Sequence, residues 1–172
     1  MNPMKHSRTI VLIALCLLAG TASAHTGSHT LTGFVSGSAH PLFGQDHLLA
    51  MIAIGLWATQ QGGRALWAVP AAFVATMVLG GALAWTGIAL PHVETAIALS
   101  VLVLGLLIAT RSHVPVLAGM AIAAGFSLFH GYAHGLEIPQ AASPAPYVLG
   151  FVLGTVILHG VGIAGSLIGR HA

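Results

Sequence analysis

The hydrophobic positions of the chain form a series of long apolar stretches, separated by short polar breaks. A helix needs about 20 apolar residues to cross the hydrocarbon core of a bilayer. The breaks are rich in Gly, Pro, Arg and His, a composition typical of turns. The pattern therefore predicts about five transmembrane helices, at residues 43–59, 65–90, 93–110, 116–133 and 147–169.

The first 24 residues have the pattern of a secretory signal peptide. Lys5 and Arg8 form a basic start, an apolar run follows, and Ala22-Ser23-Ala24 is a small-residue cleavage site. We expect residues 1–24 to be removed, so that the mature chain begins at His25. The alternative is an uncleaved first span, although the apolar run is short for one.

The segment between the signal peptide and the first predicted span, residues 26–39, is rich in Gly, Ser and Thr. Its apolar character is weak, so we interpret it as an exposed or interfacial lead-in rather than a sixth span. No later linker is long enough to divide the chain. We expect residues 25–172 to form a single all-α transmembrane domain, a polytopic helix bundle.

Composition supports this class and excludes several functions. Hydrophobic residues make up 56% of the chain and charged residues 5%, which leaves too little polar surface for a soluble globule. Without the signal peptide, three arginines balance three acidic residues, so the basic pI is no argument for nucleic-acid binding. Cys16 and Lys5 are also lost with the signal peptide, which excludes thiolate sites and a P-loop from the mature protein.

The arginines of the mature chain indicate an orientation. With the mature N-terminus outside, five spans place Arg64, Arg111 and Arg170 on the cytoplasmic side, as the positive-inside rule requires. The sequence therefore predicts a multi-pass protein of the bacterial inner membrane. Its mature N-terminus is expected to be periplasmic and its C-terminus cytoplasmic.

Ionisable side chains within a membrane are costly and usually functional, and here they fall into two clusters. The first lies at the start of the first predicted span and contains His40, Asp46 and His47. With Pro41 in the first helical turn, Asp46 and His47 would lie about two turns in, with Met51 one turn below. Two imidazoles, a carboxylate and a thioether would then converge.

The second cluster lies at the outer end of the fourth predicted span. His130, His134 and Glu137 are spaced by four and three residues, which places them on one stripe of a helix. Imidazole and carboxylate ligands suit Ni²⁺, Co²⁺, Zn²⁺ or Cu²⁺, and the lack of thiolates favours a reversible site. Gly131 and Gly135 would let a neighbouring helix bring its own ligands close.

Further histidines are weaker candidates. His159 lies near the middle of the last span, where it serves either as a ligand on an inward route or as a hydrogen-bonding group between helices. His25 and His29 would form an external antechamber or remain solvated. Weaker claims belong to three loop residues, His92, Glu94 and His113.

At the two clusters the sequence resembles the HupE/UreJ family of membrane proteins. His40-Pro41, Gly44 and Asp46-His47 match the family's first motif, and residues 129–137 match its Phe-His-Gly-x-Ala-His-Gly-x-Glu run. The resemblance implies a permease for nickel, or in some relatives cobalt, that supplies hydrogenase or urease maturation. It also marks the functional residues as His40, Asp46, His47, His130, His134 and Glu137.

The leading hypothesis is a secondary carrier or facilitator rather than an enzyme, with Ni²⁺ or Co²⁺ as cargo and no permanently bound cofactor. The alternatives are an intramembrane zinc-type metalloenzyme and a non-transporting assembly partner or metal sensor. The expected partners are a divalent metal ion and membrane lipid, and no nucleic acid. A homo-oligomer and a functional link to hydrogenase or urease accessory proteins are further partnerships that fit this hypothesis.

Overall fold

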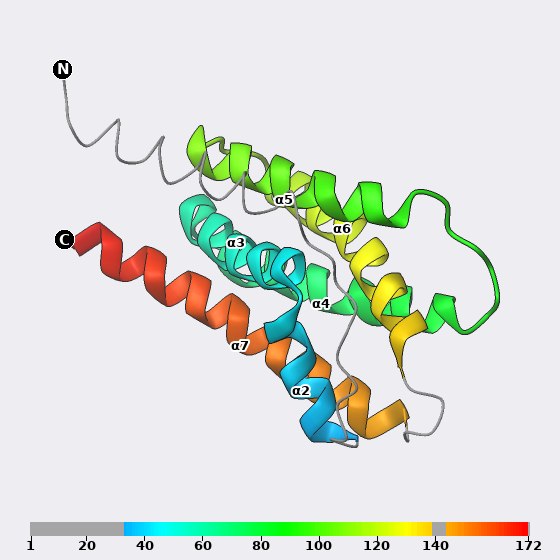
Figure 1. The fold of residues 1–172 in the computed structure, drawn as a ribbon. Helices are drawn as coiled ribbons and strands as arrows, with labels where there is room; N and C mark the ends of the chain where they lie inside the picture. Colours follow the sequence, from blue (N-terminus) through cyan, green and yellow to red (C-terminus); the bar gives the residue numbers. More distant parts are fainter. Residues whose placement is uncertain (1–32, 139–143, 172) are drawn as a thin grey trace.

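The computed structural model describes residues 33–138 and 144–171, and all regular structure in these residues is helical (Figure 1). The five predicted stretches correspond to α3 to α7, so the all-α helix-bundle fold class is confirmed. The expected signal peptide lies outside the described residues, as do His25 and His29. The helices are α2 (Phe34–Phe43), α3 (Gln45–Gln61), α4 (Ala65–Ala84), α5 (Val93–Ala109), α6 (Val116–Glu137) and α7 (Pro144–His171).

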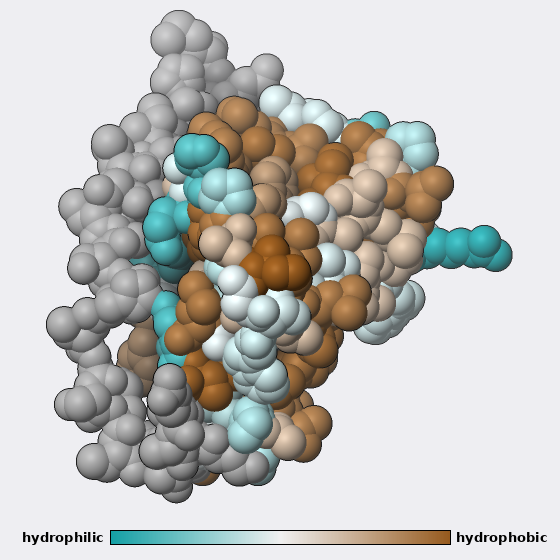
Figure 2. Space-filling model, turned by 90° about the vertical axis from the view of Figure 1, so that its right-hand side faces the viewer, coloured by the Kyte–Doolittle hydropathy of each residue, from teal (hydrophilic) through white to brown (hydrophobic). Residues whose placement is uncertain are grey.

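The lengths and surfaces of the helices fit a multi-pass membrane protein. Among the described residues, α4, α6 and α7 are each long and apolar enough to cross a membrane, and the bent pair of α2 and α3 adds a fourth candidate span. Helix α5 is equally apolar but has 17 residues. Large apolar side chains face outward, with Trp67, Leu117 and Ile168 each at least 70% exposed. Figure 2 shows that apolar side chains dominate one face of the described chain.

A second helix, α2, precedes the first predicted span and forms a broken pair with it, which the sequence did not predict. Helices α2 and α3 meet at an angle of 86°, and Gly44 between them has an extended backbone. The predicted lead-in is therefore partly helical, and Pro41 lies near the end of α2 rather than in the first turn of a span. The reason is tertiary packing, because Gly37 lets α2 lie directly against the backbone of α7 at Tyr147.

Glycines allow the helices that carry the histidines to pack closely. A methyl group on Gly131 would overlap the backbone of Met77, and one on Gly135 would overlap the backbone of Gly81. Helices α4 and α6 therefore pack backbone to backbone along much of their length. The close helix approach predicted at Gly131 and Gly135 is confirmed, but the helix that packs there, α4, contributes no ligand to the histidine clusters. The packing fixes the end of α6 that carries its three candidate ligands.

Helix α7 holds α2 and α3 in register with each other. Both pack on it, α2 near Tyr147 and α3 further along, where Gly55 lies against the carbonyl group of His159 (Figure 1). The two halves of the broken span thus share one rigid partner. This arrangement fixes the position of His40 relative to His47.

The opposite end of the bundle is tied together by Gln61, at the end of α3. Its side-chain amide donates to the carbonyl oxygen of Ser112 at 2.7 Å, and its side-chain oxygen accepts from the backbone of Val114 at 3.0 Å. The turns that contain Arg64 and Arg111 therefore lie at the same end of the bundle. The histidine clusters lie at the other end, where α3 begins and α6 ends.

Candidate metal centre

The last turns of α2 and α6 bring together three side chains at the edge of the bundle, which we call the outer triad: His40, His134 and Glu137. His40 Nε2 lies 2.9 Å from His134 Nδ1 and 2.9 Å from Glu137 Oε2. His134 Nδ1 lies 3.1 Å from the same carboxylate oxygen. The three atoms form a nearly equilateral triangle.

A second group, the inner triad, consists of His47, His130 and His134. His47 comes from the first turn of α3, and the other two come from successive turns of α6. His47 Nδ1 lies 3.1 Å from His130 Nδ1 and 2.8 Å from His134 Nε2. Three ring nitrogens therefore converge on one point inside the bundle.

His134 belongs to both triads and uses a different ring nitrogen in each. Its Nδ1 faces His40 and Glu137, whereas its Nε2 faces His47. The exposed fraction of the side chains falls from the outer triad toward the inner one, from 32% for His40 and 23% for Glu137 to 14% for His134. His47 and His130 are completely buried. The two triads thus lie on opposite sides of the His134 ring, the outer one at the surface and the inner one inside the bundle.

The outer triad holds fewer protons than its contacts require. A contact of about 3 Å between two such atoms normally needs a hydrogen atom between them. His40 Nε2 and His134 Nδ1 can carry one proton each, and an ionised Glu137 carries none, so two protons serve three contacts. A single metal cation can bind all three atoms at once, so the donor set fits a metal ion better than a hydrogen-bond network.

The electrostatic surroundings also favour a cation at this place. The C-terminal ends of α2 and α6 both lie there, and a helix C-terminus carries a partial negative charge. Glu137 adds a carboxylate among groups that are otherwise neutral or cationic. The outer triad is therefore an attractive first position for a divalent ion.

Phenylalanine rings hold the imidazole rings in place. The ring of Phe151 on α7 lies with its centre 5.9 Å from that of His40, 5.1 Å from His47 and 4.9 Å from His134. Phe73 on α4 lies between two histidines, with its centre 6.0 Å from His130 and 5.3 Å from His159. Packing thus limits how far each ring can turn.

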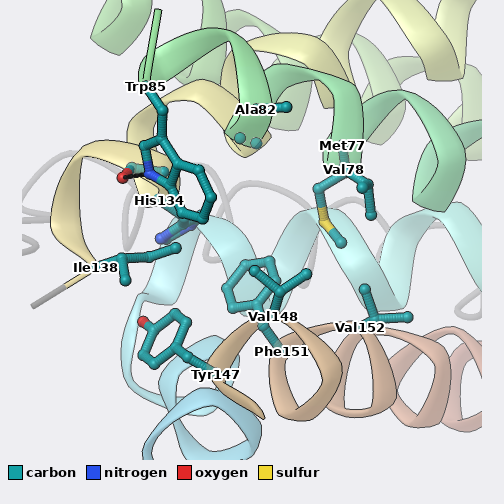
Figure 3. A pocket seen from close by; sticks show the side chains of 13 residues that line it. Met77, Val78, Ala82, Trp85, His134, Ile138, Tyr147, Val148, Phe151 and Val152 are labelled. Carbon is teal, nitrogen blue, oxygen red and sulfur yellow. Dashed lines mark hydrogen bonds between the residues drawn. The ribbon is translucent and has the colours of Figure 1, made fainter. Parts of the chain in front are cut away.

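An apolar cavity of about 160 Å³ lies beside the triads, among α4, α6 and α7. His134 forms part of its wall, and Figure 3 shows this ring between Trp85 and the pair formed by Tyr147 and Phe151. The indole N–H of Trp85 donates to the carbonyl oxygen of Gly135 at 3.0 Å. Because the cavity offers almost no polar atoms, it cannot replace the water shell of an ion. The partly exposed polar groups of the outer triad are instead those of His40 and Glu137.

The structure places the other sequence-predicted residues outside the triads. Asp46 accepts a hydrogen bond from the backbone of His47 at 2.7 Å, at the first turn of α3. Met51 is fully buried in the hydrophobic core. His159 is 3% exposed, and its Nε2 has no hydrogen-bond partner among the described residues. Three exposed residues belong to neither triad: His92 and His113 in turns, and Glu94, which lies in the first turn of α5 rather than in a loop.

Several residues that support the triads are not evident from the sequence. Phe73 and Phe151 contact the imidazole rings, and Ser100 on α5 lies 2.8 Å from His130 Nε2. In an apolar helix, a phenylalanine or a single serine carries no signal that separates a site from ordinary packing. Their roles follow from tertiary contacts between helices that are distant in sequence.

Comparison with known proteins identifies relatives of the chain. The protein family described as "HupE / UreJ protein" matches residues 13–172. The protein named "Protein HupE" from Rhizobium leguminosarum bv. viciae is 46% identical over 169 residues, covering 97% of this chain and 88% of the relative. No solved structure shows significant similarity to the chain.

Proposed function

Because the chain belongs to the HupE/UreJ family, we propose that it is a secondary carrier or facilitator that imports nickel, or alternatively cobalt, across the bacterial inner membrane. The metal would supply the maturation of a hydrogenase or a urease. Family membership supports the metal-uptake role. The arrangement of the two triads supports the carrier mechanism.

The observation that carries the proposal is the shared ligand His134. A metal ion bound to the outer triad and one bound to the inner triad would both use this ring, through opposite nitrogens. An ion that leaves His134 Nδ1 in the outer triad would therefore find the next ligand atom, Nε2, on the other side of the same ring, together with two new imidazoles, those of His47 and His130. The triads contain imidazole and carboxylate ligands and no thiolate, which favours reversible binding, as transport requires.

The ligand types restrict the metal to a small group of ions. Imidazole and carboxylate suit Ni²⁺, Co²⁺, Zn²⁺ and Cu²⁺ alike. The close contacts within the triads measure 2.8 to 3.1 Å, which is hydrogen-bond length and does not separate these ions. The proposal of nickel therefore rests on family membership.

The broken span fits the same function. Transporters bind their cargo where a membrane helix is interrupted, because the interruption frees polar groups to line the path. Here the interruption at Gly44 lies between His40 and His47 and allows one span to contribute a ligand to each triad. We propose that His159 is the next ligand on the inward route, because it is buried and contacts the same phenyl ring, that of Phe73, as His130 does.

The proposed orientation places the outer triad at the periplasmic face. The turns with Arg64 and Arg111 lie at the other end of the bundle and would face the cytoplasm, in accord with the positive-inside rule. Nickel would then enter at His40 and Glu137 and move toward the cytoplasm. Asp46, next to His47, adds negative charge near the entrance.

The second candidate function is an intramembrane metalloenzyme, which is favoured by the number of ligands in the outer triad, three side chains. A metal on the outer triad would keep coordination positions open, as catalytic metal sites do. A metalloenzyme would retain its metal through purification, whereas a carrier would release it readily. A non-transporting assembly partner, in contrast, would leave nickel uptake intact when His134 is replaced.

The proposed function is tested by radiolabelled nickel uptake in a transport-deficient bacterium that expresses the chain. We expect uptake by the intact protein and its loss in His130→Ala and Asp46→Ala variants, compared at equal membrane levels. His113→Ala serves as the matched control, because His113 lies in an exposed turn outside both triads. Uptake by the His130→Ala variant at the intact rate would contradict the route through the inner triad.

A further inference from the structure

Ser100 is a completely buried polar residue in the apolar helix α5, which lies alongside α6 (Figure 1). Its hydroxyl oxygen lies 2.6 Å from the carbonyl oxygen of Ile97 in its own helix and 2.8 Å from His130 Nε2. Both contacts have hydrogen-bond length. The serine therefore links the backbone of α5 to a ring of the inner triad.

The proton of this serine can occupy only one of the two contacts. A hydroxyl group has one hydrogen, and the carbonyl oxygen of Ile97 has none. At 2.6 Å the two oxygens would repel each other unless the hydroxyl proton lies between them. Ser100 therefore donates to Ile97 and accepts from His130, which requires a proton on His130 Nε2.

We propose that Ser100 is a positioning residue that fixes His130 in the tautomer protonated at Nε2, so that Nδ1 presents a lone pair to the inner triad. The inference deepens the proposed function, because it assigns which atom of His130 binds the metal. His130 Nδ1 is the atom that faces His47, at 3.1 Å. In other proteins a carboxylate or a carbonyl group accepts the second N–H of a metal-binding histidine and so orients its ring. Here Ser100 takes this role, because its own proton is donated to the helix backbone.

The neighbouring histidine agrees with this assignment. With a lone pair on His130 Nδ1, the metal-free contact between His47 Nδ1 and His130 Nδ1 requires a proton on His47 Nδ1. His47 Nε2 is then a lone pair, and it is the atom of this ring that is buried without a hydrogen-bond partner among the described residues. A buried lone pair without a donor is tolerated better than a buried N–H without an acceptor. For His47 Nδ1 to bind a metal ion in the inner triad with the ring neutral, its proton would move to Nε2 of the same ring.

The tautomer is read directly by ¹⁵N NMR of the histidine-labelled, metal-free full chain in lipid nanodiscs. The His130 signal is identified by its loss in a His130→Asn variant. We expect a protonated Nε2 in the intact chain, a shift toward protonated Nδ1 in Ser100→Ala, and retention of the intact pattern in Ser100→Thr, which keeps the hydroxyl. Ser127→Ala is the matched control, because Ser127 is equally buried but donates only to Ala124 in its own helix.

Nickel binding to the same samples gives the second measurement, with Ni²⁺ alone as the probe. Ser100→Ala should weaken binding about 10- to 100-fold, as loss of an orienting partner does in other metal sites, and Ser100→Thr should restore it. A His130 protonated at Nδ1 in the intact chain, or unchanged affinity in Ser100→Ala, would overturn the proposal. An intact chain that shows the expected tautomer but binds no nickel would instead refute the proposed function and leave the assignment of His130 standing.

Discussion

Replacement of His134 should weaken both metal positions at once, because this ring is the ligand that the outer and inner triads share. Each triad then falls from three ligands to two. Loss of an orienting partner alone costs 10- to 100-fold in affinity, so loss of a direct ligand should cost at least about 100-fold, or about 2.8 kcal/mol. His130→Ala weakens the inner triad alone, and His40→Ala the outer triad alone.

The assay is nickel uptake over a wide range of nickel concentrations, with cells matched for the amount of protein in the membrane. The half-saturating concentration should rise about 100-fold in the His134→Ala variant and be unchanged in His113→Ala. His134→Gln keeps a polar side chain and should show the same loss, which separates ligand loss from misfolding. An unchanged half-saturating concentration in both His134 variants would refute the shared-ligand reasoning.

Three further predictions concern pH, packing and metal release. Imidazole binds a metal in its neutral form, so protons compete with the metal and uptake should decline on acidification; uptake that rises on acidification would contradict histidine ligation. Gly131→Ala should destabilise the bundle by about 1–3 kcal/mol, because its methyl group would overlap the backbone of Met77, whereas Gly125→Ala, which faces open space, should not lower the unfolding temperature. Chelation by EDTA should remove bound nickel without loss of helical circular dichroism, since backbone packing holds the bundle; metal that resists chelation would favour the metalloenzyme.

Much of the fold follows from local pattern. Apolar stretches of membrane-spanning length predict α3 to α7, and the Gly, Pro and Arg breaks predict the turns between them. The helical spacing of His130, His134 and Glu137 places them together on α6, as the structure shows. These features depend on neighbours within a few residues, which a single sequence contains.

The break at Gly44 and the pairing of the two clusters depend on distant contacts. Helix α2 forms in a weakly apolar segment because Gly37 packs against Tyr147, about 110 residues later in the chain. His40 meets His134 across 94 positions, and His47 meets His130 across 83. The sequence therefore predicts the ligand types, while the sharing of His134 and the support from Ser100 require the fold.

Nickel transport by the chain alone is measured with the purified protein in proteoliposomes, free of any accessory protein. Radiolabelled nickel is added outside, and its accumulation inside is followed over time against empty liposomes and the His134→Gln variant. We expect accumulation by the intact chain, competition by cobalt, and little accumulation by the variant. No accumulation by the intact, correctly inserted chain would contradict the carrier function and favour the metalloenzyme or the assembly partner.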